Sequence, residues 1–200
     1  MYKLATLVLL AGFSRRMGSP KQHVKIFGKT FLQHITDALT NNSVYFNKML
    51  FVGQINDEIS QEYVKNINKG LWINNPNPEL GPLSSIRLAL KELDSDYSVL
   101  LWPVDHPLIK SSTVSHIINS WKKKPDYITI PSNGTRRGHP TIFPNWACRQ
   151  LFDIDLSQGA KQVILNNPNR INYLLTDDPF IITNLNTPES LEKISINRSI

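Results

Sequence analysis

A polar loop that carries glycines and cations follows the first apolar run of the chain. Gly12, Arg16, Gly18 and Lys21 come directly after Lys3–Leu10, a run rich in strand-forming residues. Glycine allows a ligand to approach the backbone closely, and N–H groups in such a turn can converge on an anion. Arg offers phosphate a planar fork, whereas Lys is a mobile point charge that can follow charge developing in a transition state. This loop therefore favours a polyphosphate ligand, although its pattern is neither a dinucleotide fingerprint nor a P-loop.

Two further polar loops follow apolar runs. The first, Asn75–Pro82, precedes a helical pattern whose first turn holds Ser84 and Ser85, and polar ligands are favoured at such a position. In the second loop, Asp105 stands just past Ser98–Trp102. Taken alone, an Asp before proline is more often a turn or cap residue. A carboxylate is also the ligand that a hard cation prefers, and such a cation offsets charge when a phosphorus atom is attacked.

The elements that position these loops alternate between strand and helix. Apolar runs predict strands at 3–10, 49–52, 71–73, 98–102 and 127–130, and helical spacing predicts helices at 31–39, 55–68, 83–93 and 114–121. Ser111 or Ser112 is the expected cap of the last helix. This order predicts an α/β fold, a Rossmann-like three-layer sandwich with a mostly parallel sheet. Ligands bind at the carboxyl ends of such strands, where all three polar loops fall.

Length and composition limit the alternatives. The 200 residues suit a single domain, 1–200, with nucleotide binding in about 1–110 and acceptor binding in a C-terminal subdomain over the sheet. The net charge of +6 suits polyphosphate, and the scattered cations make nucleic acid an unlikely main partner. Cys148 is the only cysteine, which excludes an intrachain disulfide. The first ten residues are too short to span a membrane, so we expect a cytoplasmic protein with no membrane partner.

The first loop resembles a family signature. The pattern L-x-A-G-x-S-x-R-M-G-x-x-K is similar to that of the nucleotidyltransferases that include molybdenum cofactor cytidylyltransferase and guanylyltransferase. It implies the nucleotide-diphospho-sugar transferase type of fold, with Arg16 on the β- and γ-phosphates and Lys21 near the reacting centre. Leu10 and Ala11 lie near the base, and the Ala leans toward the cytidylyl type, which makes CTP the favoured substrate. The matching residues are Ala11, Gly12, Ser14, Arg16, Met17, Gly18 and Lys21.

The other loops extend the resemblance. Asn75, Gly81, Ser84 and Ser85 match the family loop that contacts the nucleotide, and Asp105 matches the aspartate that coordinates Mg²⁺. Asn186 lies in a segment similar to the motif [DN]-[IL]-[DN]-T-P-E, where the matching residue can reach the metal. The same motif is also a capping turn, with Thr187 as N-cap and Pro188 at N1. The resemblance gives catalytic roles to Lys21, Arg16 and Asp105 and none to His106, which occupies a variable position.

Two segments are the predicted binding site for the acceptor. Gly138, His139 and Pro140 resemble a stretch near the acceptor in members that act on molybdopterin, although His139 could equally pack beneath a turn. Gly159 and Lys161 lie in an incomplete match to a G-x-x-G-[AL]-[RK] stretch that opens a helix, where a phosphate could bind.

Together these segments predict a Mg²⁺-dependent nucleotidyltransferase. It would move a nucleotidyl group from an NTP, CTP in the first instance, to a phosphorylated acceptor, molybdopterin in the first instance, and release pyrophosphate. The alternatives are a sugar- or alditol-phosphate nucleotidyltransferase and a non-catalytic protein of molybdenum cofactor maturation on the same fold. Transient contact with a molybdoenzyme or its chaperone is a further expectation of the resemblance.

Overall fold

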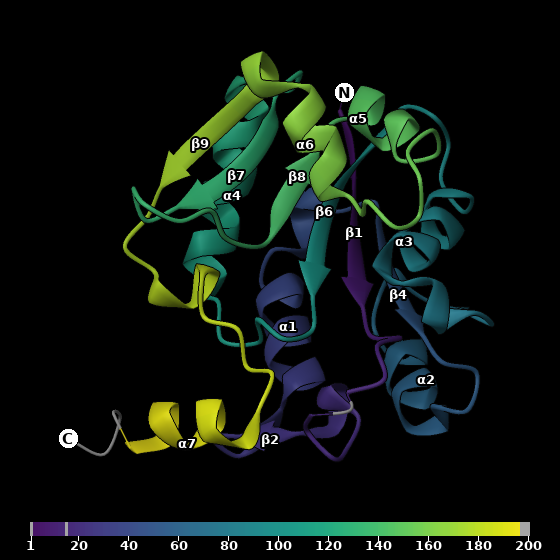
Figure 1. Cartoon of the computed structure of the whole chain (residues 1–200), viewed down its shortest axis with the longest axis vertical. Coiled ribbons are helices and arrows are strands. Elements are labelled where there is room, and N and C mark those ends of the chain that lie inside the picture. Colours follow the sequence, from purple (N-terminus) through teal and green to yellow (C-terminus); the bar gives the residue numbers. More distant parts are fainter. Residues whose placement is uncertain (1, 15, 197–200) are drawn as a thin grey trace.

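The fold is built on a seven-stranded sheet of order β5-β4-β1-β6-β8-β7-β9, seen in a computed structural model that describes residues 2–14 and 16–196 (Figure 1). The strands β1, β4, β5 and β6 are mutually parallel, β7 is parallel to β9, and β8 runs antiparallel between β6 and β7. The strands are β1 Lys3–Leu9, β4 Lys48–Gly53, β5 Gly70–Asn74, β6 Tyr97–Pro103, β7 Ile128–Ser132, β8 Thr141–Phe143 and β9 Ile171–Leu175; β2 Lys25–Ile26 and β3 Lys29–Thr30 form a small hairpin.

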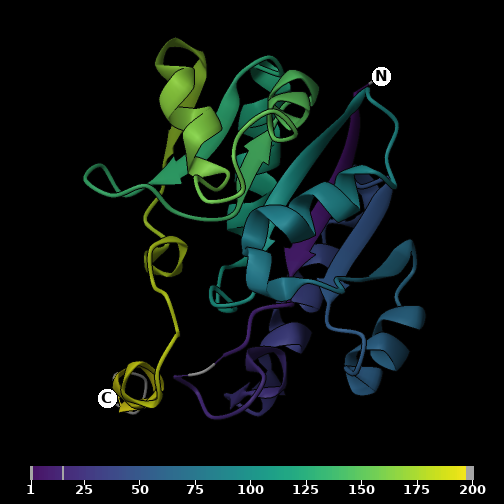
Figure 2. The same cartoon turned by 45° about the vertical axis from the view of Figure 1, so that its right-hand side comes forward.

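Helices cover both faces of the sheet, because the buried strands alternate their side chains between two apolar cores. On one face, Leu4 and Val8 of β1 share a cluster with residues of α1 and α4; on the other, Leu7 shares a cluster with residues of α3, α5 and α6. The result is the three-layer sandwich that the sequence predicts (Figures 1 and 2). The helices are α1 Phe31–Thr40, α2 Glu58–Lys65, α3 Pro82–Leu90, α4 Ser111–Lys123, α5 Asn145–Gln150, α6 Lys161–Asn166 and α7 Pro188–Ile196.

Local expectations were wrong at several elements. Helix α2 is shorter than 55–68, and Ile59, an apolar residue at helical spacing within that range, is 74% exposed, because α2 turns Val64 to the core instead. Ser111 is the first residue of α4, so the cap position falls to Lys110. A Lys side chain cannot accept a hydrogen bond from the first turn, and the Lys110 N–H donates to Asp178 Oδ2 at 2.9 Å.

The C-terminal part does not form a separate layer over the sheet. Strands β8 and β9 extend the central sheet beyond β6, so the expected subdomain over the sheet is wrong. The described part of the chain then passes the carboxyl end of β6 and finishes with α7, which stands away from the sheet in both views (Figures 1 and 2). Thr187 caps α7 as expected, since its Oγ1 accepts a hydrogen bond from the Ser190 N–H at 3.3 Å. None of the helices described here combines the length and apolarity needed to cross a membrane.

Candidate active site

The first loop and the third meet at the carboxyl edge of the sheet. Strands β1 and β6 are parallel neighbours with Leu9 paired to Pro103, so the segments that follow them emerge side by side. Between them lies a cavity of about 210 Å³. Its lining includes residues from all three predicted loops: Ala11, Gly12, Ser14, Lys21, Gly81, Ser85 and Asp105. The sequence prediction that these loops converge is therefore correct in its geometry.

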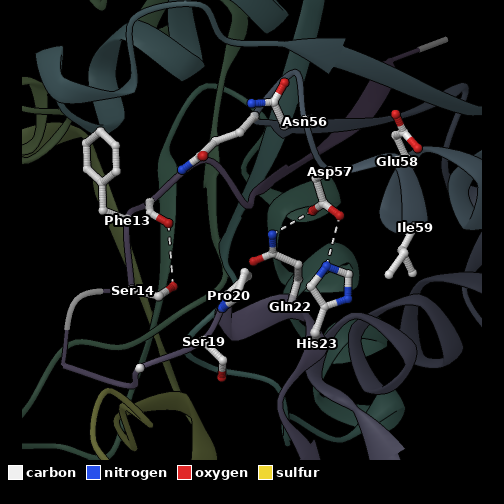
Figure 3. Close-up of a pocket in the computed structure, with 13 residues that line it drawn as sticks. Phe13, Ser14, Ser19, Pro20, Gln22, His23, Asn56, Asp57, Glu58 and Ile59 are labelled. Carbon is white, nitrogen blue, oxygen red and sulfur yellow. Dashed lines mark hydrogen bonds and ion pairs between the residues drawn. The ribbon is translucent and has the colours of Figure 1, made fainter.

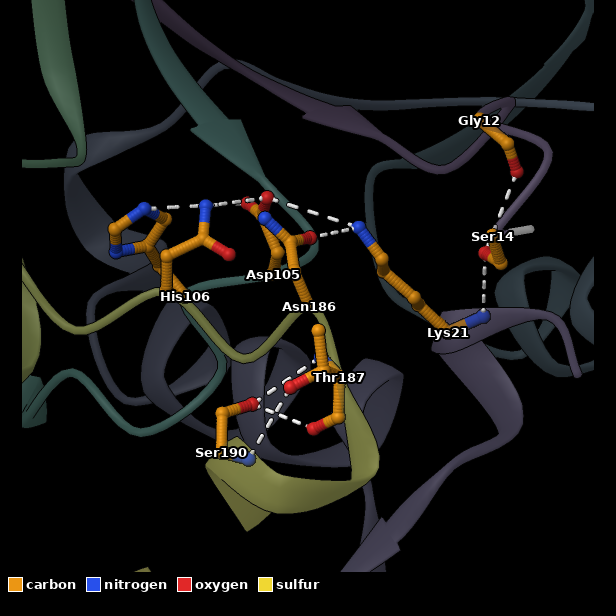
Figure 4. A network of polar contacts seen from close by, with 9 residues as sticks. Gly12, Ser14, Lys21, Asp105, His106, Asn186, Thr187 and Ser190 are labelled. Atoms are coloured by element: carbon orange, nitrogen blue, oxygen red, sulfur yellow. Dashed lines mark hydrogen bonds and ion pairs between the residues drawn. The ribbon is translucent and has the colours of Figure 1, made fainter. Parts of the chain in front are cut away.

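Lys21 is the centre of a polar network at this edge (Figure 4). Its ammonium donates a hydrogen bond to Asn186 Oδ1 and lies 3.8 Å from Asp105 Oδ2. Its backbone is fixed as well, because the Lys21 N–H donates to Ser14 Oγ at 3.0 Å. Lys21 and Asn186 are thus brought into contact although they are 165 positions apart in the chain.

The network shifts the acidity of Lys21. Burial lowers the pKa of the Lys21 ammonium below its ordinary value, and the nearby charge of Arg16 lowers it further, while Asp105 opposes both. Because charge in a partly dry site interacts more strongly than in water, this ammonium suits a role against a polyphosphate. Arg16 itself is exposed and lines neither of the cavities beside the loop.

Two more partners hold Asp105. The side-chain amide of Asn184 donates to Asp105 Oδ2 at 2.7 Å, and the Leu185 N–H donates to the Asp105 backbone oxygen at 2.8 Å. The other carboxylate oxygen, Oδ1, is buried and has no hydrogen-bond partner among the described residues. The segment 184–186 therefore fixes Asp105 and leaves one oxygen of its carboxylate uncommitted.

These atoms pass a simple test for a hard cation. Mg²⁺ takes one or two protein oxygens and completes its shell with phosphate oxygens and water. The uncommitted Asp105 Oδ1 and the amide oxygen of Asn186 are oxygen ligands of that kind. Within the described part of the chain no three His, Cys, Asp or Glu side chains cluster as a metal cage. The donor set thus fits a shared Mg²⁺ site and does not fit a closed protein cage.

The second loop is organised by Asn75. This side chain is 2% exposed, and its amide donates to Ser84 Oγ at 3.0 Å and to Ser85 Oγ at 2.8 Å. Ser84 Oγ also donates to the Gly81 carbonyl at 2.7 Å. Asn75 therefore shapes the loop from beneath, while Gly81 and Ser85 line the cavity.

Positions within the first loop divide into buried support and open surface. The side chain of Leu10 is 1% exposed and belongs to the core, so its predicted nearness to the base does not place that side chain in the cavity. A Cβ added at Gly12 would meet nothing within 4 Å, which leaves open space for a ligand. The left-handed backbone falls on Ser14 at φ 51° and on Gly18 at φ 69°, and not on Gly12.

A second cavity of about 830 Å³ lies on the other side of the first loop, toward α2 (Figure 3). Gly12, Ser14 and Gly18 line it from the loop, and Gln54 and Ile59 line it from the segment around the start of α2. Gln54 also donates to the Ala11 carbonyl at 3.0 Å. The first loop therefore lies between the two cavities, and Gly12 and Ser14 line both of them.

The first predicted acceptor segment, 138–140, packs against the buried His106. His139 packs on His106 with ring centroids 4.9 Å apart. The backbone N–H of His139 donates to the Ile181 carbonyl at 2.9 Å. Burial, aided by the neighbouring His106, lowers the pKa of His139 to about 4. Gly138 lies so close to Ile181 that an added Cβ would be 2.5 Å from its carbonyl oxygen. Pro140 is buried too, so packing accounts for much of this segment.

His106, to which sequence reasoning gave no role, joins that packing. It is 6% exposed, its backbone oxygen accepts from Trp102 Nε1 at 2.9 Å, and its Nε2 lies 3.9 Å from Asp105 Oδ1. Burial lowers its pKa, with Asp105 acting in the opposite direction. Asn184 was also missed as a contact of Asp105, although its place two residues before Asn186 in the same motif was a usable signal.

The second acceptor segment lies apart from the network. Gly159 has a φ of 66°, and the following helix α6 begins at Lys161, as the resemblance suggests. Lys161 is exposed, and neither residue lines the cavities beside the first loop. Their part in acceptor binding stays a prediction.

Residues 6–171 match the family described as the MobA-like NTP transferase domain. This chain belongs to that family. The MobA-like domain spans the first loop, Asp105 and the first acceptor segment, so the predicted family and its nucleotidyltransferase activity class are confirmed.

Named relatives of this MobA-like chain align over nearly its full length. A probable molybdenum cofactor guanylyltransferase of Geobacillus sp. is 24% identical, with 97% of this chain and 99% of the relative aligned. A molybdenum cofactor guanylyltransferase of Photobacterium profundum is 26% identical over 93% of each chain.

Solved structures share the fold. The crystal structure of Rv0371c from Mycobacterium tuberculosis superposes with a TM-score of 0.80 at 17% identity, covering 98% of both chains. Rv0371c in complex with manganese gives a TM-score of 0.76 at 16% identity, again over 98% of both chains. The predicted fold class is therefore confirmed.

Proposed function

We propose that the chain transfers a nucleotidyl group from an NTP to a molybdopterin-type acceptor phosphate. An oxygen of the acceptor phosphate would attack the α-phosphorus, the bond from that phosphorus to the α,β-bridging oxygen would break, and pyrophosphate would leave. The observation that carries the proposal is the Lys21–Asp105–Asn186 network beside open backbone at the end of β1. No covalent enzyme intermediate is needed, because the acceptor phosphate is already ionised at neutral pH and needs positioning more than deprotonation.

The network supports catalysis by charge and position. Lys21 would move from Asn186 and Asp105 to the phosphate oxygens, on which negative charge builds during the attack. Ser14 holds the Lys21 backbone and Asn184 holds the Asp105 carboxylate, so both groups are placed before substrate arrives. When bound, Mg²⁺ would act as a Lewis acid that neutralises charge on the triphosphate. Asp105 and Asn186 would hold it, and the manganese complex of Rv0371c supports a divalent cation in this fold.

GTP is the nucleotide that the relatives favour. The full-length relatives carry guanylyltransferase names, whereas the sequence pattern at Ala11 favoured CTP. The choice of CTP was based on Ala11 and Gly12, and the buried Leu10 side chain adds no support to it. We therefore place GTP first and keep CTP as the alternative that the experiment must separate.

The test is a panel of the four NTPs with Mg²⁺ and molybdopterin, with pyrophosphate release as the signal. Activity with GTP alone supports the proposal, and activity with CTP alone restores the cytidylyl alternative. Release only with sugar or alditol phosphates as acceptors would move the activity to that class, and silence with all acceptors would favour a non-catalytic maturation protein.

The acceptor side can be tested in the same assay. Replacing the exposed Lys161 with Ala should raise the KM for the acceptor about threefold to tenfold and leave the KM for the nucleotide unchanged. Lys123→Ala on α4 is the matched control. An unchanged acceptor KM in Lys161→Ala would remove Lys161 from the acceptor site.

A further inference from the structure

The turn that carries Lys21 is held from the side opposite the network. Lys21 is the first residue of the 3-10 turn Lys21–His23, and the two residues that follow it both contact Asp57. Gln22 Nε2 donates to Asp57 Oδ2 at 2.6 Å, and His23 Nε2 lies 2.9 Å from Asp57 Oδ1. A carboxylate only accepts, so the proton of the second contact must be on His23 Nε2. Figure 3 shows both contacts of Asp57 as dashed lines.

Asp57 is well placed to be a fixed point. Its side chain is 7% exposed, and it caps α2 by accepting a hydrogen bond from the Ser60 N–H at 3.1 Å. Burial alone would raise the pKa of this carboxyl, but hydrogen bonds from Gln22 and Ser60 outweigh burial and lower it. Asp57 is therefore a carboxylate at neutral pH, with three partners on two segments.

The surroundings make this contact matter for the loop. Between the first loop and α2 lies the open cavity of about 830 Å³, so side chains do not fill the space there. Asp57 spans the gap at one end through Gln22 and His23. Without it, the turn would keep the hydrogen bond from the Lys21 N–H to Ser14 Oγ, but would lose its side-chain contacts with Asp57 at the start of α2.

We propose that Asp57 is a positioning residue that fixes Lys21 by clamping the turn Lys21–His23 to the start of α2. The proposal deepens the proposed function, since it assumes that Lys21 acts on the triphosphate. Asp57 itself touches no reacting atom. It sets where the turn lies, and the turn sets how far the Lys21 ammonium reaches toward Asp105 and Asn186.

The sharpest variant is Asp57→Ser. Serine is a good N-cap, so the cap of α2 is kept, but its side chain is too short to reach Gln22 and His23. We expect kcat/KM for the nucleotide to fall about tenfold, with most of the loss in kcat, because a small displacement of a catalytic group slows the chemical step. Asp37→Ser is the matched control, since it removes the exposed carboxylate that pairs with Lys29 at 2.6 Å.

A second measurement reports on the turn without any turnover. Amide hydrogen exchange of the turn Lys21–His23 is compared between the native protein and Asp57→Ser. The His23 N–H, which donates to the Pro20 carbonyl at 3.0 Å, should exchange about tenfold faster in Asp57→Ser, because the turn opens more readily once its contacts with α2 are lost. Unchanged exchange in this turn refutes the clamp.

The two proposals fail in different ways. If no acceptor or NTP gives turnover, the proposed function falls, but hydrogen exchange in the turn Lys21–His23 still tests the clamp. If Asp57→Ser does not fold, the double variant Gln22→Ala with His23→Ala removes the same contacts from the other side and leaves the α2 cap intact. It should give the same loss in kcat/KM and the same faster exchange in the turn; an unaltered double variant overturns the proposal.

Discussion

The two ends of the candidate site are built in different ways. At the nucleotide end, Lys21, Asp105 and Asn186 come from three distant segments and meet through polar contacts beside open space. At the acceptor end, His139 and Gly138 are packed against the backbone around Ile181. Several motif residues at the predicted nucleotide end, such as Gly12 and Lys21, therefore line a cavity, whereas the motif residues of the first acceptor segment mainly hold the fold.

The glycines of the two motifs make the same contrast. Gly12 faces a space where an added Cβ meets nothing within 4 Å, and Gly138 faces a carbonyl oxygen that such a Cβ would approach to 2.5 Å. Gly12 therefore borders open space, whereas Gly138 leaves room for the Ile181 backbone. Substitutions at the two ends should therefore separate activity from stability.

The largest effect is expected at Lys21. Lys21→Ala should lower kcat/KM about 10²- to 10³-fold, as for the loss of one charge-stabilising donor, while the thermal midpoint stays close to that of the native protein. The check is steady-state kinetics with a melting curve, and Lys25→Ala in the nearby hairpin is the control. Normal nucleotidyl transfer by Lys21→Ala would contradict the assignment of the nucleotide end.

Asp105 comes next in size. Asp105→Asn keeps the shape and removes the charge, so kcat should fall about 10²-fold at fixed Mg²⁺, and half-activation should need a higher Mg²⁺ concentration. A Mg²⁺ titration of the rate measures both. The exposed Asp153→Asn serves as the control, and an unchanged Mg²⁺ requirement in Asp105→Asn would remove Asp105 from the metal site.

Much of this end could be predicted from sequence. The buried runs of β1 and β6 and their parallel order place the loop after Leu9 and Asp105 at one edge, and periodicity is enough to find them. The partner of Lys21 could not be found in that way, because Asn186 reaches it only after the chain has added β7, β8 and β9 to the sheet. The family motif named Asn186, but the contact itself depends on tertiary packing.

The acceptor end was harder to predict for a physical reason. A Gly-His-Pro stretch looks the same in sequence whether it binds a ligand or packs beneath a turn, and only the distance from Gly138 to Ile181 separates the two. The exposed Ile59 gives the same lesson in α2, where helical spacing was correct but the core-facing side was decided by Val64. Spacing predicts an element, and its neighbours decide which side is buried.

The two glycines allow a paired test. Gly138→Ala should lower the free energy of unfolding by about 1–3 kcal/mol, because the Ile181 backbone must move to admit the methyl group. Gly12→Ala should change stability by less than about 0.5 kcal/mol and instead weaken nucleotide binding. Chemical denaturation and nucleotide titration of both variants measure the four quantities. A destabilised Gly12→Ala together with a stable Gly138→Ala would reverse the comparison.

The smallest expected effect is the pH dependence that His139 gives to the acceptor end. Its pKa is about 4 in the folded chain against about 6.5 in an unfolded one, so the unfolded state binds the extra proton between these values. Stability should therefore be constant above about pH 6.5 and fall as the pH drops toward 4, by about 2 kcal/mol, since partial exposure of the ring reduces the effect. Denaturation curves from pH 4 to 8 should show a shallower fall in His139→Gln, while His116→Gln on the exposed side of α4 should follow the native protein. If stability falls with pH as steeply in His139→Gln as in the native protein, His139 is solvated. That result would favour the role in acceptor binding that its motif suggested.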